Sequence, residues 1–170
     1  MSNIHNEAKI TDIEVVNVRR AAIEHRGKWA AAFYLEAKKD GIDLEPIMRR
    51  AVYNIGLQSG KEELEKLGGK VSAKSYGEYF CLKKYNETFE KHIEEVNGED
   101  DFICSLNYCP LVHAWQKIGL DDETCHMLCD IAMEGDRGIA EGLGLDFDIE
   151  GTMSEGCEKC ILHYRAKKQD

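Results

Sequence analysis

Residues 97–110, which read NGEDDFICSLNYCP, decide the fold class of this 170-residue chain. The pair Asn97-Gly98 is typical of a tight β-hairpin turn. Alternate residues after the turn are apolar and predict a strand with one buried face, formed by Phe102, Cys104 and Leu106. Cys109-Pro110 then ends the strand and opens a helix, because proline is well tolerated in a first helical turn. The stretch therefore predicts a hairpin that leads into a helix.

The sequence upstream of this stretch predicts helices. Thr11 begins a capping-box pattern with Glu14, and apolar residues at helical spacing extend this first helix to about Lys39. A second helix is expected to begin near Leu44, although glycines within it weaken the pattern. Its expected inward-facing residues are Ile47, Ala51, Ile55 and Leu57.

Apolar periodicity places the remaining elements. Helices are expected over residues 75–85, 110–118 and 123–134, and strands over residues 89–96, 102–106, 145–153 and 157–165. Asp121 or Asp122 is expected to cap the last of these helices. The glycine-rich residues 135–144 are expected to carry only a short helical turn.

These elements predict an α+β fold. A helical N-terminal half is followed by a four-stranded, mainly antiparallel sheet, with helices inserted between two hairpins. A length of 170 residues suits a single domain over residues 1–170. Its helical part covers residues 1–86, and its cysteine-rich α+β part covers residues 87–170.

Charge and composition exclude several functional classes. The net charge of −10, from 22 basic and 32 acidic residues, argues against a nucleic-acid partner. No stretch is apolar enough to span a membrane, and the polar start lacks a signal-peptide core. We therefore expect a cytoplasmic protein with no nucleic-acid partner and no membrane partner, while the sequence leaves a homo-oligomer open.

The seven cysteines indicate free thiols, a metal site or catalytic thiols rather than a disulfide framework. Cys109 precedes a helix, whose free N–H groups and dipole favour a thiolate. His113 lies one helical turn further on, and a thiol with an imidazole nearby is the basis of an activated nucleophile. The alternative is a small buried apolar residue beside a surface histidine.

Other chemistry-bearing residues have structural alternatives. Cys125 and Cys129 share one helix face, which suits core packing. Asp130 lies in an apolar neighbourhood and is either a general base with a raised pKa or an exposed helix residue. The pair Cys157-x-x-Cys160 resembles a metal or redox pair. Residues three apart on a regular strand point to opposite faces, so the two thiols could bind one metal only if Cys157 belongs to the turn.

Three ordered motifs occupy the last third of the chain. They are Cys109-Pro110-Leu111-Val112 with Ala114-Trp115 and Gly119, then Cys129-Asp130-Ile131, then Gly156 followed by Cys160. Together they resemble the L-2-amino-thiazoline-4-carboxylic acid hydrolase family. By this resemblance Cys109, Cys129 and Cys160 match the motif cysteines, and Asp130 matches the motif carboxylate.

The resemblance implies a hydrolase acting on carbon–nitrogen bonds other than peptide bonds. Its substrate would be like L-2-amino-thiazoline-4-carboxylate, a cyclic amidine-type ring that opens to an N-carbamoyl-cysteine-like product. Cys109 is expected to be the nucleophile or polarising group, and Asp130 the acid or base. His113 joins the catalytic set from helical spacing alone, the role of Cys160 is undetermined, and no cofactor is required.

Two alternatives stay open. In the first, the chain holds an iron–sulfur cluster or zinc, with ligands drawn from Cys109, Cys125, Cys129, Cys157 and Cys160. In the second, the same motifs line the pocket of a non-catalytic protein that binds a small molecule. Metal content separates the first alternative from the hydrolase, and turnover separates the second.

Overall fold

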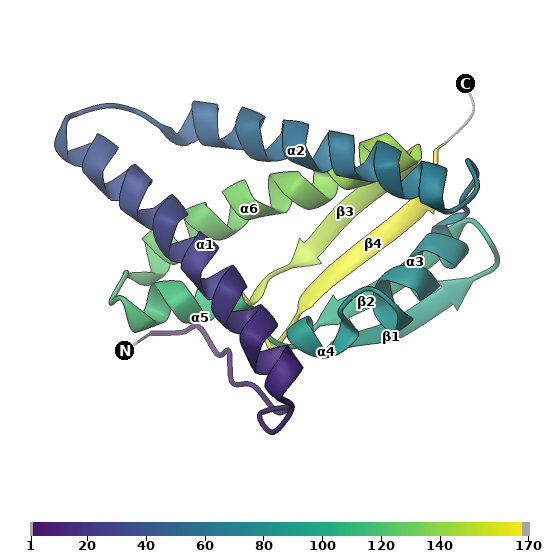
Figure 1. Cartoon of the computed structure of the whole chain (residues 1–170), viewed down its shortest axis with the longest axis horizontal. Helices are drawn as coiled ribbons and strands as arrows, with labels where there is room; N and C mark the ends of the chain where they lie inside the picture. The colour runs from purple at the N-terminus through teal and green to yellow at the C-terminus, as the bar shows by residue number, and fades with distance from the viewer. Residues whose placement is uncertain (1, 168–170) are drawn as a thin grey trace.

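The computed structural model of the chain describes residues 2–167 and has an α+β fold (Figure 1). The helices are α1 (Glu14–Lys39), α2 (Glu45–Lys66), α3 (Ala73–Leu82), α4 (Asn86–Phe89), α5 (Pro110–Lys117) and α6 (Asp122–Leu143). The strands are β1 (Lys91–Asn97), β2 (Asp101–Leu106), β3 (Leu145–Gly151) and β4 (Cys160–Ala166), and the 3₁₀-helix η1 covers Met153–Glu155. The predicted fold class is confirmed. None of the helices in this part of the chain is long and apolar enough to cross a membrane.

The four strands form one antiparallel sheet in the order β1-β2-β4-β3. The expected hairpin turn is confirmed: Asn97 pairs with Asp101, and Gly98 adopts the positive φ of 69° that favours glycine. The two hairpins join through β2 and β4, where Cys104 lies opposite Leu162. The predicted inward face of β2 is buried, and α3 packs against this part of the sheet.

Helices α2 and α6 pack through glycines, with their backbones in close approach. A side chain at Gly56 would overlap the carbonyl group of Gly135, and one at Gly60 would overlap that of Ile139. In return, a side chain at Gly138 would overlap the backbone of α2. Such an approach requires glycine because any other residue adds a Cβ atom. Figure 1 shows the two helices running alongside each other.

The predicted inward face of α2 is therefore wrong. Gly56 and Gly60 are buried, whereas Ile47 is 51% exposed and Ile55 is 68% exposed. The prediction assumed that a helix buries its large apolar residues, but here the buried stripe consists of its smallest residues.

Helix α6 also extends beyond its predicted end near residue 134. Residues 135–143 are helical, and Gly144 ends the helix with a positive φ of 75°. Glycines weaken an isolated helix, but those of α6 allow its close packing on α2, which offsets this weakness. The expected cap is confirmed, since the Asp121 carboxylate accepts a hydrogen bond of 2.7 Å from the Thr124 N–H.

Helix α1 crosses the molecule and packs against α5 (Figure 1). The indole Nε1 of Trp115 donates a hydrogen bond of 2.9 Å to the carbonyl oxygen of Gly27. The capping box expected at Thr11 is not formed, because the N-cap of α1 is Ile13, which provides no side-chain hydrogen bond. Ahead of α1, residues 2–10, here called the N-terminal segment, run past α5 towards the end of α4.

Candidate functional site

Cys109 occupies the N-cap position of α5, as the sequence predicts. Burial raises the pKa of its thiol, and the backbone N–H groups of Val112 and Leu111, which favour a thiolate, partly oppose this rise although the thiol forms no cap hydrogen bond. The residue is 8% exposed. The thiol is therefore protonated at neutral pH and needs a nearby base in order to react.

Cys129 of α6 and Cys160 of β4 lie close to Cys109. Burial raises the pKa of Cys129 to about 12 and also raises that of Cys160, and a charge on Cys109 adds to both effects. The backbone N–H of Met153 donates to the Cys160 sulfur at 3.4 Å. All three cysteines are buried in the same core cluster. The fold thus gathers the three motif cysteines from three separate elements.

Helix η1 connects this thiol cluster to the surface. The Ser154 hydroxyl forms a hydrogen bond with the Cys129 thiol, and it lies 2.9 Å from Thr152 Oγ1 and 3.5 Å from His126 Nδ1. Glu155 completes a capping box by accepting both the N–H and the hydroxyl hydrogen bonds of Thr152, each at 2.8 Å. Sequence reasoning missed this network, although Thr152-x-x-Glu155 is a capping-box pattern.

Asp130 lies in an ion-pair network on the surface of α6. Its carboxylate contacts Arg49 of α2 and Arg137 of α6, each at 2.7 Å. Burial alone raises the pKa of Asp130, but hydrogen bonds from Arg137 and Arg49 outweigh this effect and the pKa is lowered. The geometry therefore favours a carboxylate that is ionised at neutral pH and is a weak base.

Asp136 has the opposite environment. It follows Cys129 by seven residues, which places it on the same helix face as the buried Cys125, Cys129 and Ala140. Burial raises the pKa of Asp136, and the positive charges that oppose this rise, Lys84 first, act without a hydrogen bond to it. A charge on Asp136 in turn raises the pKa of Cys109. Asp136 is thus a carboxyl with a raised pKa whose charge acts on Cys109. The sequence did not indicate it, because the predicted helix ended near residue 134.

Residues 20–164 match the family described as L-2-amino-thiazoline-4-carboxylic acid hydrolase. The chain belongs to this family. The matched residues include all three motifs and most of the chain, so the resemblance inferred from the motifs is confirmed. None of the curated proteins matches this member of the family.

The fold of this family member is similar to that of a solved trafficking protein. The crystal structure of a trafficking protein particle complex subunit 3 from Naegleria fowleri, covalently bound to palmitic acid, aligns with a TM-score of 0.59 and 13% sequence identity. The alignment covers 88% of this chain and 97% of the other. At this identity the likeness shows a shared fold.

The side chains of the remaining candidate residues from the sequence, His113, Cys125 and Cys157, show no hydrogen bond to the three motif cysteines among the described residues. His113 packs its ring 6.0 Å from that of Tyr108, and the described residues show no hydrogen bond between its imidazole and the Cys109 thiol. Cys125 is buried, and its sulfur lies 4.0 Å from the Leu120 carbonyl oxygen. Cys157 is exposed while Cys160 is buried, so this pair does not form a shared site.

The cysteines do not form a metal centre within residues 2–167. No three His, Cys, Asp or Glu side chains of this part of the chain come together in an arrangement that could hold a metal ion. The donor set considered for zinc or an iron–sulfur cluster therefore does not fit either group, because both need three or four converging ligands.

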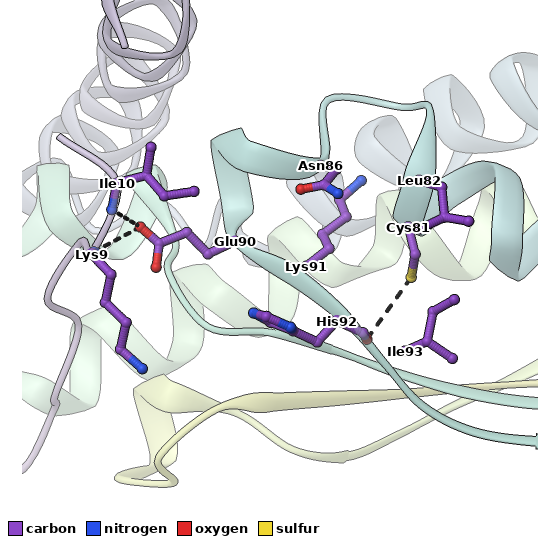
Figure 2. A pocket seen from close by; sticks show the side chains of 9 residues that line it. All are labelled: Lys9, Ile10, Cys81, Leu82, Asn86, Glu90, Lys91, His92 and Ile93. Carbon is purple, nitrogen blue, oxygen red and sulfur yellow. Dashed lines mark hydrogen bonds between the residues drawn. The ribbon is translucent and has the colours of Figure 1, made fainter. Parts of the chain in front are cut away.

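Pockets of different size lie in two places, one beside η1 and one beside the N-terminal segment. A pocket of about 100 Å³ lies beside the η1 network and is lined by His126, Asp130 and Thr152, among others. A larger one, of about 560 Å³, lies between the N-terminal segment, the end of α3 and β1 (Figure 2). The larger pocket contains none of the motif residues, so we assign the candidate site to the thiol cluster and not to the larger hollow.

Proposed function

We propose that this protein is a thiol-dependent hydrolase that opens a small cyclic amidine-type ring, with an L-2-amino-thiazoline-4-carboxylate-like substrate. One observation carries the proposal: the other two motif cysteines, Cys129 and Cys160, lie close to Cys109, and Cys109 lies at a helix N-terminus. That position stabilises a thiolate when it forms. The family match supports the substrate class.

The reaction begins with proton removal from Cys109. The Asp136 carboxylate, whose charge acts on Cys109, takes this proton through intervening water, and the thiolate attacks the ring carbon that is bonded to sulfur and to two nitrogens. The ring carbon–sulfur bond then breaks, and the departing sulfur takes the proton back from Asp136. The intermediate is an isothiourea in which the former ring carbon is attached to Cys109.

Water completes the reaction. It adds to the isothiourea carbon, the bond to Cys109 breaks, and the thiol is regenerated along with a urea-type product. An N-carbamoyl-cysteine-like product keeps both nitrogens on the former ring carbon. The bond that breaks in forming this product is therefore carbon–sulfur, while cleavage of the ring carbon–nitrogen bond would give an S-carbamoyl product instead.

Arg26 of α1 is the cation we assign to the substrate carboxylate. Its positive charge lowers the pKa of both Cys109 and Asp136, so it lies within electrostatic range of both groups. A guanidinium suits a carboxylate because it offers paired donors in one plane.

Turnover of aminothiazoline carboxylate by single variants tests this function. Cys109→Ser should lower kcat/KM by about 10³-fold or more, because a hydroxyl is a far weaker nucleophile than a thiolate. Cys157→Ser is the matched control, since Cys157 is exposed and should be dispensable. Full activity in Cys109→Ser would remove the nucleophile role from this residue.

A second candidate is non-catalytic binding of a small molecule. The observation in its favour is the similar fold of the Naegleria fowleri protein, which was solved with covalently bound palmitic acid. In this chain a buried thiol such as Cys109 would hold the acyl group. The intact mass of the purified protein separates the two functions. A mass increase equal to one acyl group, lost on hydroxylamine treatment, favours non-catalytic binding. An unmodified chain that catalyses ring opening favours the hydrolase.

A further inference from the structure

The N-terminal segment holds the backbone of Cys109 through a single buried side chain. Asn6 Nδ2 donates a hydrogen bond of 2.8 Å to the Cys109 carbonyl oxygen, and the Cys109 N–H donates one of 2.8 Å to Asn6 Oδ1. Both residues are 8% exposed. One amide therefore satisfies both polar backbone groups of the cysteine, across 103 positions of sequence.

The segment is tied to the rest of the fold on either side of Asn6. Before Asn6, the N–H of Asn3 donates a hydrogen bond of 2.8 Å to an Asp122 carboxylate oxygen. After it, the N–H groups of Lys9 and Ile10 donate to Glu90 Oε1 at 2.7 and 2.8 Å (Figure 2). Glu90 is itself buried in a salt bridge with Arg20. Asn6 is thus held in the middle of a segment that is anchored at both ends.

The orientation of the Cys109 thiol depends on this backbone. The side chain of an N-cap residue faces the free N–H groups of the first helical turn only while its own backbone stays extended. Cys109 has a φ of −129° and a ψ of 112°, and its neutral thiol lies at this position without forming a cap hydrogen bond. The N–H groups concerned are those of Val112 and Leu111. Rotation of either peptide group of Cys109 would move the thiol away from them.

We propose that Asn6 is a positioning residue, which holds the Cys109 backbone so that the thiol faces the N–H groups at the start of α5. The inference rests on the proposed function only in its consequence for turnover, because the geometry concerns the thiol itself. Asn6 lies outside residues 20–164, the part of the chain that matches the family. The alternative is that Asn6 merely anchors the segment to the protein.

The two roles predict opposite changes in Cys109. Loss of positioning removes N–H groups from the thiolate, which raises the pKa of Cys109. Loss of an anchor alone lets the segment open and admits water to Cys109, which relieves burial and lowers that pKa. The pH at which Cys109 becomes half-reactive therefore separates them.

The experiment measures the rate at which methyl methanethiosulfonate labels Cys109 across a pH series, by peptide mass mapping of the full chain. We expect Asn6→Ala and the volume-conserving Asn6→Leu to raise the midpoint by about one pH unit, or tenfold slower labelling near neutral pH. Gln116→Ala is the control, since it removes the 3.1 Å bond to the Ile4 carbonyl oxygen and leaves Asn6 intact. Its midpoint should equal that of the wild type.

An unchanged or lowered midpoint in the Asn6 variants overturns the proposal. If Asn6→Ala fails to fold, Asn6→Leu decides alone, because it keeps the side-chain volume. Turnover is measured in parallel. A raised midpoint in a chain that never opens the ring would sustain the positioning role and reject the hydrolase, whereas normal turnover with a wild-type midpoint would reject the positioning role only.

Discussion

Asp136 lies two helical turns beyond Cys129 on the buried face of α6, and Cys129 lies close to Cys109. A carboxyl whose pKa burial raises thus lies within electrostatic range of Cys109. A raised pKa brings a carboxyl closer to the range in which it can both take and return a proton at neutral pH. Asp130, directly beside Cys129 in sequence, has two arginine partners instead.

Asp136→Asn should separate thiol reactivity from turnover. Removing the negative charge lowers the pKa of Cys109, so labelling of this thiol near neutral pH should become faster. Ring opening should nevertheless slow by about 10²- to 10⁴-fold, because the proton acceptor is lost. Labelling rate and kcat of the same preparation check this. A parallel change in both, in either direction, would contradict the proton-transfer role.

Ionisation of Asp136 and ionisation of Asp130 should change the stability of the fold in opposite directions. The raised pKa of Asp136 means that its ionisation disfavours the folded state, an effect present above the raised pKa and absent below the ordinary Asp value of about 4. The lowered pKa of Asp130 means that its ionisation favours the folded state, an effect lost as the pH falls through that lowered value.

Thermal unfolding near pH 7 tests this difference. Asp136→Asn should raise the Tm. Asp130→Asn should lower the Tm slightly, because Asp130 is partly exposed and its ion pairs should contribute about 1 kcal/mol or less to the free energy of unfolding. As the pH falls below about 4, Asp136→Asn should approach the wild type, whereas Asp130→Asn should do so only as the pH falls through the lowered pKa of Asp130. A lower Tm for Asp136→Asn near pH 7 would show that its carboxylate has a favourable partner.

The glycine contact between α2 and α6 predicts a sharp difference between neighbouring positions. Gly138→Ala and Gly56→Ala place a Cβ inside the facing backbone and should lower the free energy of unfolding by about 1–3 kcal/mol. Gly135→Ala is the matched control, because its Cβ would lie 3.5 Å from Val52 Cγ1, an ordinary contact. It should be neutral or stabilising by about 0.5–1 kcal/mol, since alanine is the better helix residue. Urea unfolding of the three variants checks the ranking.

The buried pair Arg20–Glu90 should be essential for holding the N-terminal segment. Their side chains are 5% and 4% exposed, and Glu90 also accepts the N–H groups of Lys9 and Ile10. Glu90→Ala leaves the Arg20 charge buried without its partner and should cost about 3–5 kcal/mol of unfolding free energy. Limited proteolysis should then cut within residues 2–10 first. Resistance equal to that of the wild type would show that the segment is held by other contacts.

Local patterns in the sequence predicted the parts of the fold that local chemistry determines. The turn at Asn97-Gly98, the buried alternation of β2 and the helix start after Cys109 all depend on residues within a few positions of each other. Together with the ordered motifs, they led to the fold class and to the family.

Features that depend on contacts between distant segments could not be predicted from the sequence. Gly56 is buried because α6 lies against it, and Asp136 shares the helix face of Cys129 because α6 continues past glycines that would otherwise weaken it. Asn6 meets Cys109 only in the folded chain. A single sequence shows no sign of such a pairing, since both residues have ordinary local surroundings.

A covalent bond between substrate and Cys109 is the most direct test of the central claim. Wild-type protein is mixed with aminothiazoline carboxylate, quenched in acid within the first turnover, and mapped by peptide mass spectrometry. We predict an increase equal to the mass of the substrate on the peptide that carries Cys109, and none on the peptides with Cys81 or Cys157. Ring opening at the wild-type rate by Cys109→Ser, with no cysteine modified in the wild type, would contradict the account.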